Sequence, residues 1–573
     1  MVQRFCTILV SLTFVVSLTF AGAEKVNRVT LFHDAPVSNV AVTPTPESPA
    51  ANPQVGSYTG ISGFYDYQSN GGVPQYIRVN PSNGNIHIVM MTGIDSASIS
   101  AGRRTAYALS TDGGGSWNSF NNLLVPNRRS GFPSLDLGQA AIAGAPIIAN
   151  HSTVTGTQST ALIDFPEGSG AFAEVGGPPG VAGAPGADEP IWPFVAGASD
   201  GSIVMAGSRS TGLTNWITRT ADYTSWGSWT QYPDSNDSGG RYITLSNSTG
   251  RVAVLLNTVD HGVYLLESTD NGVSWPAHPT TLFGPWPQTA DSLTSWVAVD
   301  GVYNGDNVLA AFSVSTSSDP VNIGYDYAGS RIMFWSQATG LVTAVAHDTT
   351  LFLNSTNISQ SNHLTVDWPA IGVSGNQIVI AFIAFSPDTA SNGHHYINIW
   401  AVNSNNGGAT WSPPTKLTTT PNLDTRYPSI SKYNPPGFAY MVWQEDTMPG
   451  NSVGVGTDAA PVTRSRQVFY KFPIPATGVD EKGILPSSFS LEQNYPNPFN
   501  PATTIDYTVP QTGPVTIKVF NALGQEVATL VNELRAAGTY RETFDATSLS
   551  SGVYIYRMQS GNFAESKKML FLK

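Results

Sequence analysis

Seven segments between residues 74 and 443 share one pattern, and this repeat constrains the fold more than any other feature of the chain. In each segment an aromatic residue precedes a short apolar run, a turn that contains glycine or asparagine, and a second apolar run. Two apolar runs joined by such a turn are typical of an antiparallel β-hairpin. The aromatic residues that mark the seven hairpins are Tyr76, Phe132, Trp192, Tyr242, Trp296, Trp368 and Tyr427.

The distance between successive marker residues, 50 to 72 positions, predicts the architecture. A repeat of this length leaves room for two more strands per unit, as in the four-stranded blades of a propeller. The 55 glycines, 40 prolines and only 12% charged residues agree with a protein rich in turns and strands. We therefore predict an all-β chain with a seven-bladed β-propeller over residues 57–473. We expect the marker aromatics to pack between blades, with a sugar-stacking ring at the channel mouth as the alternative.

An eight-residue phrase recurs at a constant place in three of these units. It reads STDGGGSW at 110–117, STDNGVSW at 268–275 and SNNGGATW at 404–411. That place corresponds to the turn between the third and fourth strands, where an aspartate accepts backbone hydrogen bonds and a glycine adopts positive φ. We interpret the phrase as a structural turn whose tryptophan packs into the blade. Its residues are Ser110, Asp112, Gly114 and Trp117; Ser268, Asp270, Gly272 and Trp275; and Ser404, Asn406, Gly408 and Trp411.

These phrases resemble the Asp-box, or bacterial neuraminidase repeat, of the sialidase-like propeller superfamily. The first two match S-x-D-x-G-x-[ST]-W in full, and the third carries Asn406 where aspartate is expected. Because sialidases have six blades, the resemblance leaves a six-bladed propeller as the alternative to seven. It does not fix an activity, because such propellers include hydrolases, lyases, receptors and binding proteins.

Sialidase chemistry is only partly matched by the sequence. Family sialidases bind the substrate carboxylate with three arginines, use a tyrosine activated by a glutamate as nucleophile, and protonate the leaving group with an aspartate. The first family arginine opens the first blade in an [FY]-R-I-P phrase, but here Pro74 holds that place and Arg78 lies nearer the turn. Similar phrases occur in later blades, and their arginines either bind an anion in the central channel or pair with surface carboxylates. The candidate channel residues are Arg241, Tyr242, Arg426 and Tyr427.

We name no catalytic residue, metal ligand or cofactor from the sequence. Glu189, Asp367 and Glu445 lie near strand ends, but no second acid stands at a spacing that indicates a catalytic pair. The nine histidines form no metal-binding motif, and calcium binding in a loop stays open. The chain is therefore more typical of a non-catalytic propeller that binds glycans or proteins. An exo-α-sialidase-type glycoside hydrolase is the first alternative, and an adhesin or surface-layer component is the second.

The N-terminal segment predicts export. Residues 1–23 combine Arg4, an apolar run and the small residues Ala-Gly-Ala, as in a secretory signal peptide, and residues 24–56 form a spacer with five prolines. The single cysteine, Cys6, lies inside the signal, so the mature chain is expected to have no disulfide. A net charge of −13 disfavours nucleic acid and anionic membranes as partners. No later run reaches the roughly 20 apolar residues of a transmembrane segment.

Residues 163–190 are too rich in glycine and proline for blade strands. We expect an insertion loop from the second blade, disordered at the surface, with a binding role as the alternative.

The final segment, residues 488–573 after a linker at 474–487, alternates apolar and polar residues between short turns, which predicts an Ig-like antiparallel sandwich. It resembles the type A C-terminal sorting domain of the type IX secretion system. The phrases that carry the resemblance are NYPNPFNP, VFNALGQEV, AAGTY, LSSGVYIYR and SKKMLFLK. The resemblance implies recognition by the secretion machinery, release across the outer membrane to the cell surface or the medium, and removal of this domain on exit. An Ig-like domain without a sorting role is the alternative.

Overall fold

The computed structural model describes the chain from Val55 to Lys573, apart from short internal segments. The predicted signal peptide, nearly all of the predicted spacer and linker, and Arg241 lie outside the described residues. The residues left out are 1–54, 70–71, 154–155, 176, 179, 182–188, 210–213, 233–241, 259–260, 286–292, 317–325, 354–362, 420–421, 454–458, 475–488, 495, 511–512, 536–537 and 562.

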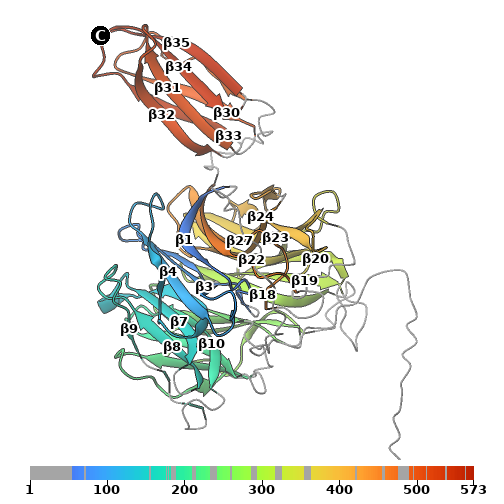
Figure 1. The fold of residues 1–573 in the computed structure, drawn as a ribbon. Helices are drawn as coiled ribbons and strands as arrows, with labels where there is room; N and C mark the ends of the chain where they lie inside the picture. Colours follow the sequence, from blue (N-terminus) through green and yellow to red (C-terminus); the bar gives the residue numbers. More distant parts are fainter. Residues whose placement is uncertain are drawn as a thin grey trace, which may run out of the picture.

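Seven antiparallel four-stranded sheets, counted over the described residues, form the blades of a propeller (Figure 1). The predicted blade number is therefore confirmed, and the six-bladed alternative is wrong. In the first six blades the strands follow one another from the innermost to the outermost, and the first strands of neighbouring blades contact each other around the channel.

The strands of the first three blades have the following bounds. Blade 1 consists of β2 (Ile77–Val79), β3 (Ile86–Gly93), β4 (Arg103–Ser110) and β5 (Asn118–Leu124). Blade 2 consists of β6 (Ser130–Leu137), β7 (Pro146–Thr153), β8 (Thr157–Ile163) and β9 (Ala173–Glu174), with a short 3-10 helix, η1 (Ala140–Ile142), after β6. Blade 3 consists of β10 (Pro190–Gly197), β11 (Ile203–Arg209), β12 (Asn215–Thr220) and β13 (Thr230–Gln231).

The next three blades follow the same order. Blade 4 consists of β14 (Tyr242–Ser246), β15 (Val252–Asn257), β16 (Val263–Ser268) and β17 (Thr280–Phe283). Blade 5 consists of β18 (Leu293–Asn304), β19 (Asn307–Thr316), β20 (Asp326–Ser336) and β21 (Gly340–Val345). Blade 6 consists of β22 (Val366–Ser374), β23 (Gln377–Thr389), β24 (His395–Ser404) and β25 (Thr415–Lys416).

Blade 7 closes the ring with strands from the two ends of the propeller sequence. Its three inner strands are β26 (Asp424–Ile430), β27 (Phe438–Asp446) and β28 (Ser465–Pro473), and its outermost strand is β1 (Ser57–Gly63). Because β1 pairs antiparallel with β28 inside blade 7, backbone hydrogen bonds join the two ends of the propeller sequence and close the ring.

The hydrophobic core lies between neighbouring blades. One cluster, for example, joins Ile88 of blade 1, Leu135 of blade 2 and Val442 of blade 7. Six of the seven marker aromatics are less than 10% exposed, and the seventh, Phe132, is half-buried. These side chains therefore pack between blades and do not form a sugar-stacking ring.

An aromatic–proline pair introduces a bulge into four of the innermost strands. At these four positions the aromatic residue has a positive φ, and the strand register shifts there relative to its partner. The following proline has no N–H to donate, so the ladder is interrupted and the strand bends into the channel wall. The pairs are Phe132-Pro133, Trp192-Pro193, Trp368-Pro369 and Tyr427-Pro428.

The three repeated turns, residues 110–117, 268–275 and 404–411, each lie between the third and fourth strands of a blade. In the first, Ser110 Oγ donates to Asp112 Oδ1 at 2.8 Å, and Asp112 accepts the N–H of Ser116 at 2.9 Å. In the third, Asn406 Oδ1 keeps the backbone bond to Thr410 at 3.0 Å, while its Nδ2 donates to Thr410 Oγ1 at 2.8 Å. In the first turn the hydroxyl of Ser116 donates to the carboxylate of Asp112, whereas in the third turn the amide of Asn406 donates to the hydroxyl of Thr410. Asparagine can therefore replace aspartate in this turn.

Two of the three tryptophans of these turns, Trp117 and Trp411, contact an aromatic ring of the preceding blade. Trp117 meets Phe469 of blade 7 with ring centroids 5.0 Å apart, and Trp411 meets Phe334 of blade 5 at 5.2 Å. The first and third turns thus connect the outer part of one blade to its neighbour.

Replacing Gly408 by alanine is expected to destabilise the propeller by about 2–4 kcal/mol, because two costs combine. Gly408 has a φ of +90°, and a Cβ atom there would lie 2.1 Å from Cε1 of Phe334. The matched control is Gly407→Ala, since Gly407 has a φ of +71° but open space around the new methyl group. Urea unfolding followed by tryptophan fluorescence compares the two variants, and equal midpoints would contradict the role assigned to the contact with Phe334.

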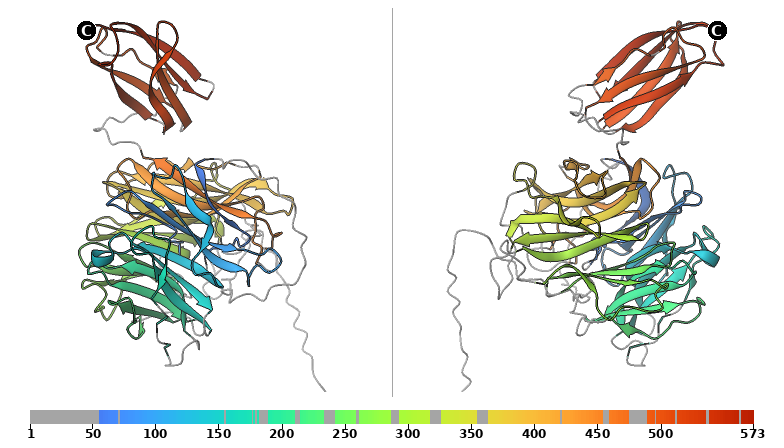
Figure 2. Two further views of the ribbon diagram at one scale, coloured as in Figure 1. Left: turned by 60° about the vertical axis from the view of Figure 1, so that its left-hand side comes forward. Right: turned by 180° about the vertical axis from the view of Figure 1, so that it is seen from behind.

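The C-terminal segment forms a sandwich of two antiparallel sheets, which face each other in Figure 2. One sheet has the order β29 (Ser490–Leu491), β30 (Ala502–Val509), β33 (Gly538–Asp545), and the other the order β32 (Glu526–Arg535), β31 (Gly513–Asn521), β34 (Gly552–Ser560), β35 (Phe563–Phe571). Residues such as Tyr507, Ile517 and Tyr556 alternate inward and form its own core.

The insertion predicted at residues 163–190 is partly built into the fold. Glu167 accepts hydrogen bonds from Asn80 at 3.0 Å and Asn83 at 2.7 Å, and its carboxylate lies 2.7 Å from Nε2 of His87. Glu167 is therefore held on blade 1, and Ala173–Glu174 of the same segment forms β9, the fourth strand of blade 2. Both findings correct the expectation of a disordered surface loop without blade strands.

Candidate functional site

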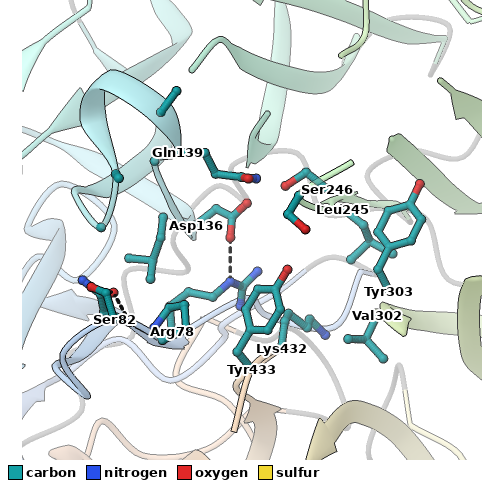
Figure 3. A pocket seen from close by; sticks show the side chains of 18 residues that line it. Arg78, Ser82, Asp136, Gln139, Leu245, Ser246, Val302, Tyr303, Lys432 and Tyr433 are labelled. Carbon is teal, nitrogen blue, oxygen red and sulfur yellow. Dashed lines mark hydrogen bonds and ion pairs between the residues drawn. The ribbon is translucent and has the colours of Figure 1, made fainter. Parts of the chain in front are cut away.

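A pocket of about 430 Å³ lies at one mouth of the central channel. It is formed where the innermost strands β2, β6, β14 and β18 end and where the chain leaves β26 (Figure 3). Ligand pockets in proteins typically enclose about 300–1,000 Å³, so this channel-mouth pocket has the size of a small-ligand site. Its charged and aromatic lining comes from four blades, through Arg78, Asp136, Tyr303, Lys432 and Tyr433.

A buried ion pair forms one side of the pocket floor. Lys432 Nζ lies 2.7 Å from both carboxylate oxygens of Asp300 on β18 and donates a third hydrogen bond to the carbonyl of Ile371 at 3.1 Å. Burial lowers the pKa of Lys432 to about 8, although the carboxylate of Asp300 acts in the opposite direction. At neutral pH this ammonium is charged, and all three of its N–H groups have acceptors.

A second ion pair, Arg78–Asp136, lies beside the first, and Gln75 connects the two. Arg78 Nε donates to Asp136 Oδ1 at 2.8 Å, and Arg78 Nη2 donates to Gln75 Oε1 at 3.0 Å. Gln75 Nε2 in turn donates to Asp300 Oδ1 at 2.9 Å. The floor therefore contains two cations and two anions in one hydrogen-bonded network, and its net charge is close to zero.

The walls of the pocket differ from the floor because they are aromatic and weakly polar. Tyr433 is 43% exposed, while Tyr303 is buried and donates its hydroxyl to Glu267 at 2.9 Å. Gln139 and Ser246 both donate to the carbonyl of Gly197, at 2.6 and 2.7 Å, which fixes their side chains at the rim. The pocket thus presents one exposed aromatic ring and several positioned oxygen and nitrogen atoms.

The residues predicted from the sequence lie elsewhere. Arg426 and Tyr427 belong to the start of β26, whereas Lys432 follows its end, so they lie toward the opposite end of the channel from the pocket. Arg426 is only 4% exposed and donates from Nε to Asp424, so its ion pair is buried and not at the surface. Tyr427 packs edge-on against Trp368 at 5.2 Å.

Tyr242, the first residue of β14, donates its hydroxyl to the carbonyl of Trp192 at 2.8 Å and is 1% exposed. Its predicted neighbour Arg241 lies outside the described residues. No described contact therefore brings the predicted channel residues together into one binding site.

The carboxylates noted in the sequence have structural partners. Asp367 accepts the backbone N–H groups of Leu364 at 2.9 Å and Trp368 at 2.8 Å, and Glu445 accepts the hydroxyl of Tyr58. A tyrosine beside a glutamate is the nucleophile pair of sialidases, but Tyr58 belongs to the outermost strand of blade 7. Burial, together with the charge of Glu445, raises the pKa of Tyr58 to about 12, which is the opposite of activation.

Two buried carboxyl groups lie on the side of the channel away from the pocket. Asp66 accepts two hydrogen bonds from Ser452, and Asp446 Oδ1 accepts the N–H of Met448 at 3.1 Å. Burial, reinforced by the charge of Asp446, raises the pKa of Asp66 to about 7, and burial raises that of Asp446 to about 6. Ionisation of these two buried carboxyl groups at neutral pH is therefore unfavourable for the folded protein.

The variant Asp446→Asn is expected to stabilise the propeller by about 1–3 kcal/mol at pH 8 and by much less at pH 4.5. The folded-state pKa values of about 6 and 7 lie above those of the unfolded chain, so the neutral carboxyls stabilise the fold below pH 4 and this contribution is lost as the pH rises. The amide keeps the oxygen that accepts from Met448 and Thr463. Thermal unfolding across this pH range measures the effect, and an equal gain at pH 4.5 would contradict the electrostatic cause.

Two features were sought in the described residues, a cluster of metal-binding side chains and a long apolar helix. No group of three or more His, Cys, Asp or Glu side chains gathers there in an arrangement that could hold a metal ion. No helix in the described part of the chain is long and apolar enough to cross a membrane.

Comparison with known families assigns the sandwich. Residues 493–572 match the family described as "Secretion system C-terminal sorting domain". The chain carries a type IX sorting domain. This domain directs the protein across the outer membrane to the cell surface or the medium, and it implies an interaction with the secretion machinery. No curated protein matches the chain.

The chain is also similar to several solved structures at low identity. A polysaccharide lyase, the PL25 ulvan lyase, is 9% identical with a TM-score of 0.41, and the match covers 72% of this chain and 95% of that one. Polysaccharide lyase Uly1 is 10% identical with a TM-score of 0.40 over 79% of this chain and 100% of that one. A protein of unknown function from Dyadobacter fermentans is 11% identical with a TM-score of 0.37 over 60% and 97%. The resemblance of the repeated turns to sialidases stays a prediction.

Proposed function

We propose that the exported propeller binds an extracellular glycan at the channel-mouth pocket and does not cleave it. The observation that carries this proposal is the combination of an exposed Tyr433 ring with a floor whose charges are already paired. An aromatic face and a few fixed polar atoms suit a sugar ring, which offers an apolar face and hydroxyl groups at its edge.

The paired floor favours a neutral sugar over an anionic one. Lys432 has no N–H left to offer, because its three donors bind Asp300 and Ile371. Asp136, whose side chain is 15% exposed, is the most accessible charged group of the network. A carboxylate accepts hydrogen bonds, so it selects hydroxyl donors and repels an acidic ligand.

The same geometry supports binding without hydrolysis. Glycoside hydrolases commonly use two carboxyl groups on either side of the scissile bond. Among the described residues that line the pocket, Asp136 is the single carboxylate, and Arg78 holds it in an ion pair.

Replacing Tyr433 by alanine is expected to weaken glycan binding at least tenfold, equivalent to about 1.4 kcal/mol, without lowering the melting temperature. The purified protein is first tested on an array of neutral and acidic glycans, and the best ligand is then titrated by calorimetry. Leu341→Ala is the control, because Leu341 is 42% exposed on β21 and does not line the pocket.

Four results would contradict the proposal. Preference for acidic glycans, or unchanged binding by Tyr433→Ala, would show that the pocket is not the glycan site. Turnover of a fluorogenic sialoside that is lost in Arg426→Ala would favour the hydrolase alternative. Self-association without sugar, seen by sedimentation, would favour the adhesin or surface-layer alternative.

A further inference from the structure

The two outer faces of the sorting domain differ in chemistry. On the three-stranded sheet, the outward side chains of β30 and β33 are small or charged, and Arg541 binds both carboxylate oxygens of Asp506 at 2.6 and 2.7 Å. Thr543, which is opposite Thr504, continues this polar surface. Such a face is typical of an antiparallel sheet that is exposed to water.

The outer face of the four-stranded sheet is instead apolar at its centre. Val553 and Ile555 on β34 are each 40% exposed. Register places Ile555 opposite Phe520 of β31 and Val553 opposite Leu570 of β35, and these two partners are half-buried. The four side chains therefore form a continuous patch across three strands, and exposed apolar patches of this kind mark interaction surfaces.

Cations surround this patch on the same face. Lys568 is paired in register with Ile555, and Arg557 is paired with Lys518. Lys518 forms an ion pair with Glu526 at 2.8 Å. Among the described residues, neither Arg557 nor Lys568 has a carboxylate within ion-pair distance, so two positive charges remain available to a partner.

We propose that this apolar-basic face, formed by Lys518, Phe520, Val553, Ile555, Arg557, Lys568 and Leu570, docks the sorting domain on a protein of the outer-membrane secretion machinery. The partner surface is apolar at its centre and carries carboxylates at its edge. An apolar centre excludes water, and two unpaired cations orient the partner and suppress docking in other registers. The polar face of the other sheet has no comparable patch among its described residues.

The test uses the full chain, expressed in a bacterium that has a type IX system. Arg557→Glu combined with Lys568→Glu is expected to reduce the protein at the cell surface and in the medium at least tenfold and to leave it in the periplasm. Ile555→Asp is expected to act in the same direction. Arg557→Lys combined with Lys568→Arg keeps both charges and is expected to be exported like the original chain.

Controls separate docking from folding and from other partners. Arg541→Glu with Thr543→Glu places acidic groups on the opposite face and is expected to leave export unchanged. Protease resistance of the retained protein verifies that the sandwich is folded. Normal export of the Arg557→Glu, Lys568→Glu variant, or equal loss in the opposite-face control, would overturn the proposal. Charge-dependent binding of the purified chain to phosphatidylglycerol vesicles would show that the apolar-basic face binds lipid, and would overturn the proposal of a protein partner.

Discussion

Deletion of residues 486–573 is expected to abolish export while the propeller still folds. The sorting domain lies wholly within this segment, so the secretion machinery loses the feature that it recognises. The propeller keeps its ring closure, because β1 and β28 both lie outside the deletion. The deletion also removes Leu534, a sandwich side chain that is half-buried against the propeller core. Because half-burial of one leucine contributes little, we expect the unfolding free energy of the propeller to change by no more than about 1 kcal/mol.

Fractionation of cells that express the truncated chain measures the first effect, and urea unfolding of the purified truncated and full-length chains measures the second. The periplasmic fraction is expected to contain nearly all of the truncated propeller. Recovery from the medium at the full-length yield would show that another segment carries the export signal. A large fall in the unfolding midpoint would show that the two domains are coupled in stability.

The propeller could be predicted because its information is repeated locally. Each blade begins with an aromatic residue and a hairpin, and seven copies of a weak pattern are stronger than one. The bulges at the four aromatic–proline pairs were missed, although proline after a marker aromatic signals an interrupted ladder.

The sandwich shows where local patterns fail. Five of its strands alternate clearly between apolar and polar residues, but Glu526–Arg535 does not. This strand lies at the edge of its sheet, and two register shifts in its pairing with β31 disturb the alternation of buried residues. An edge strand with bulges has no strict period of two, so its sequence resembles a loop.

The channel-mouth pocket could not be found through the sialidase resemblance, because the phrases that we compared lie at the start of the innermost strands. The charged residues of its floor come from four blades, and Asp300 and Lys432 are 132 positions apart. Their proximity depends on closure of the ring. A signal was nevertheless present, since Arg78, Asp136, Asp300 and Lys432 each follow a marker aromatic by two to five residues.

Replacing Lys432 by methionine is expected to destabilise the propeller by about 3–5 kcal/mol, because it leaves the buried carboxylate of Asp300 without its cation. Asp300 is 1% exposed and would keep hydrogen bonds only from neutral donors, Gln75 and the backbone of Gly301 and Ile371. Urea unfolding at pH 7 measures the loss. Arg219→Gln is the control, because it removes a surface ion pair with Asp200, for which a change below about 1 kcal/mol is expected.

A double-mutant cycle tests whether the loss belongs to the pair itself. Asp300→Asn removes the negative charge, so Lys432→Met in that background no longer leaves a buried carboxylate without its cation. The loss of unfolding free energy caused by Lys432→Met is then expected to be at least about 1 kcal/mol smaller than in the original chain. If the decreases in unfolding free energy of the two single variants simply add, Lys432→Met destabilises the propeller through altered packing, and the ion pair does not stabilise the channel floor. If they couple, the same paired charges that hold four blades together also keep the floor neutral toward a ligand.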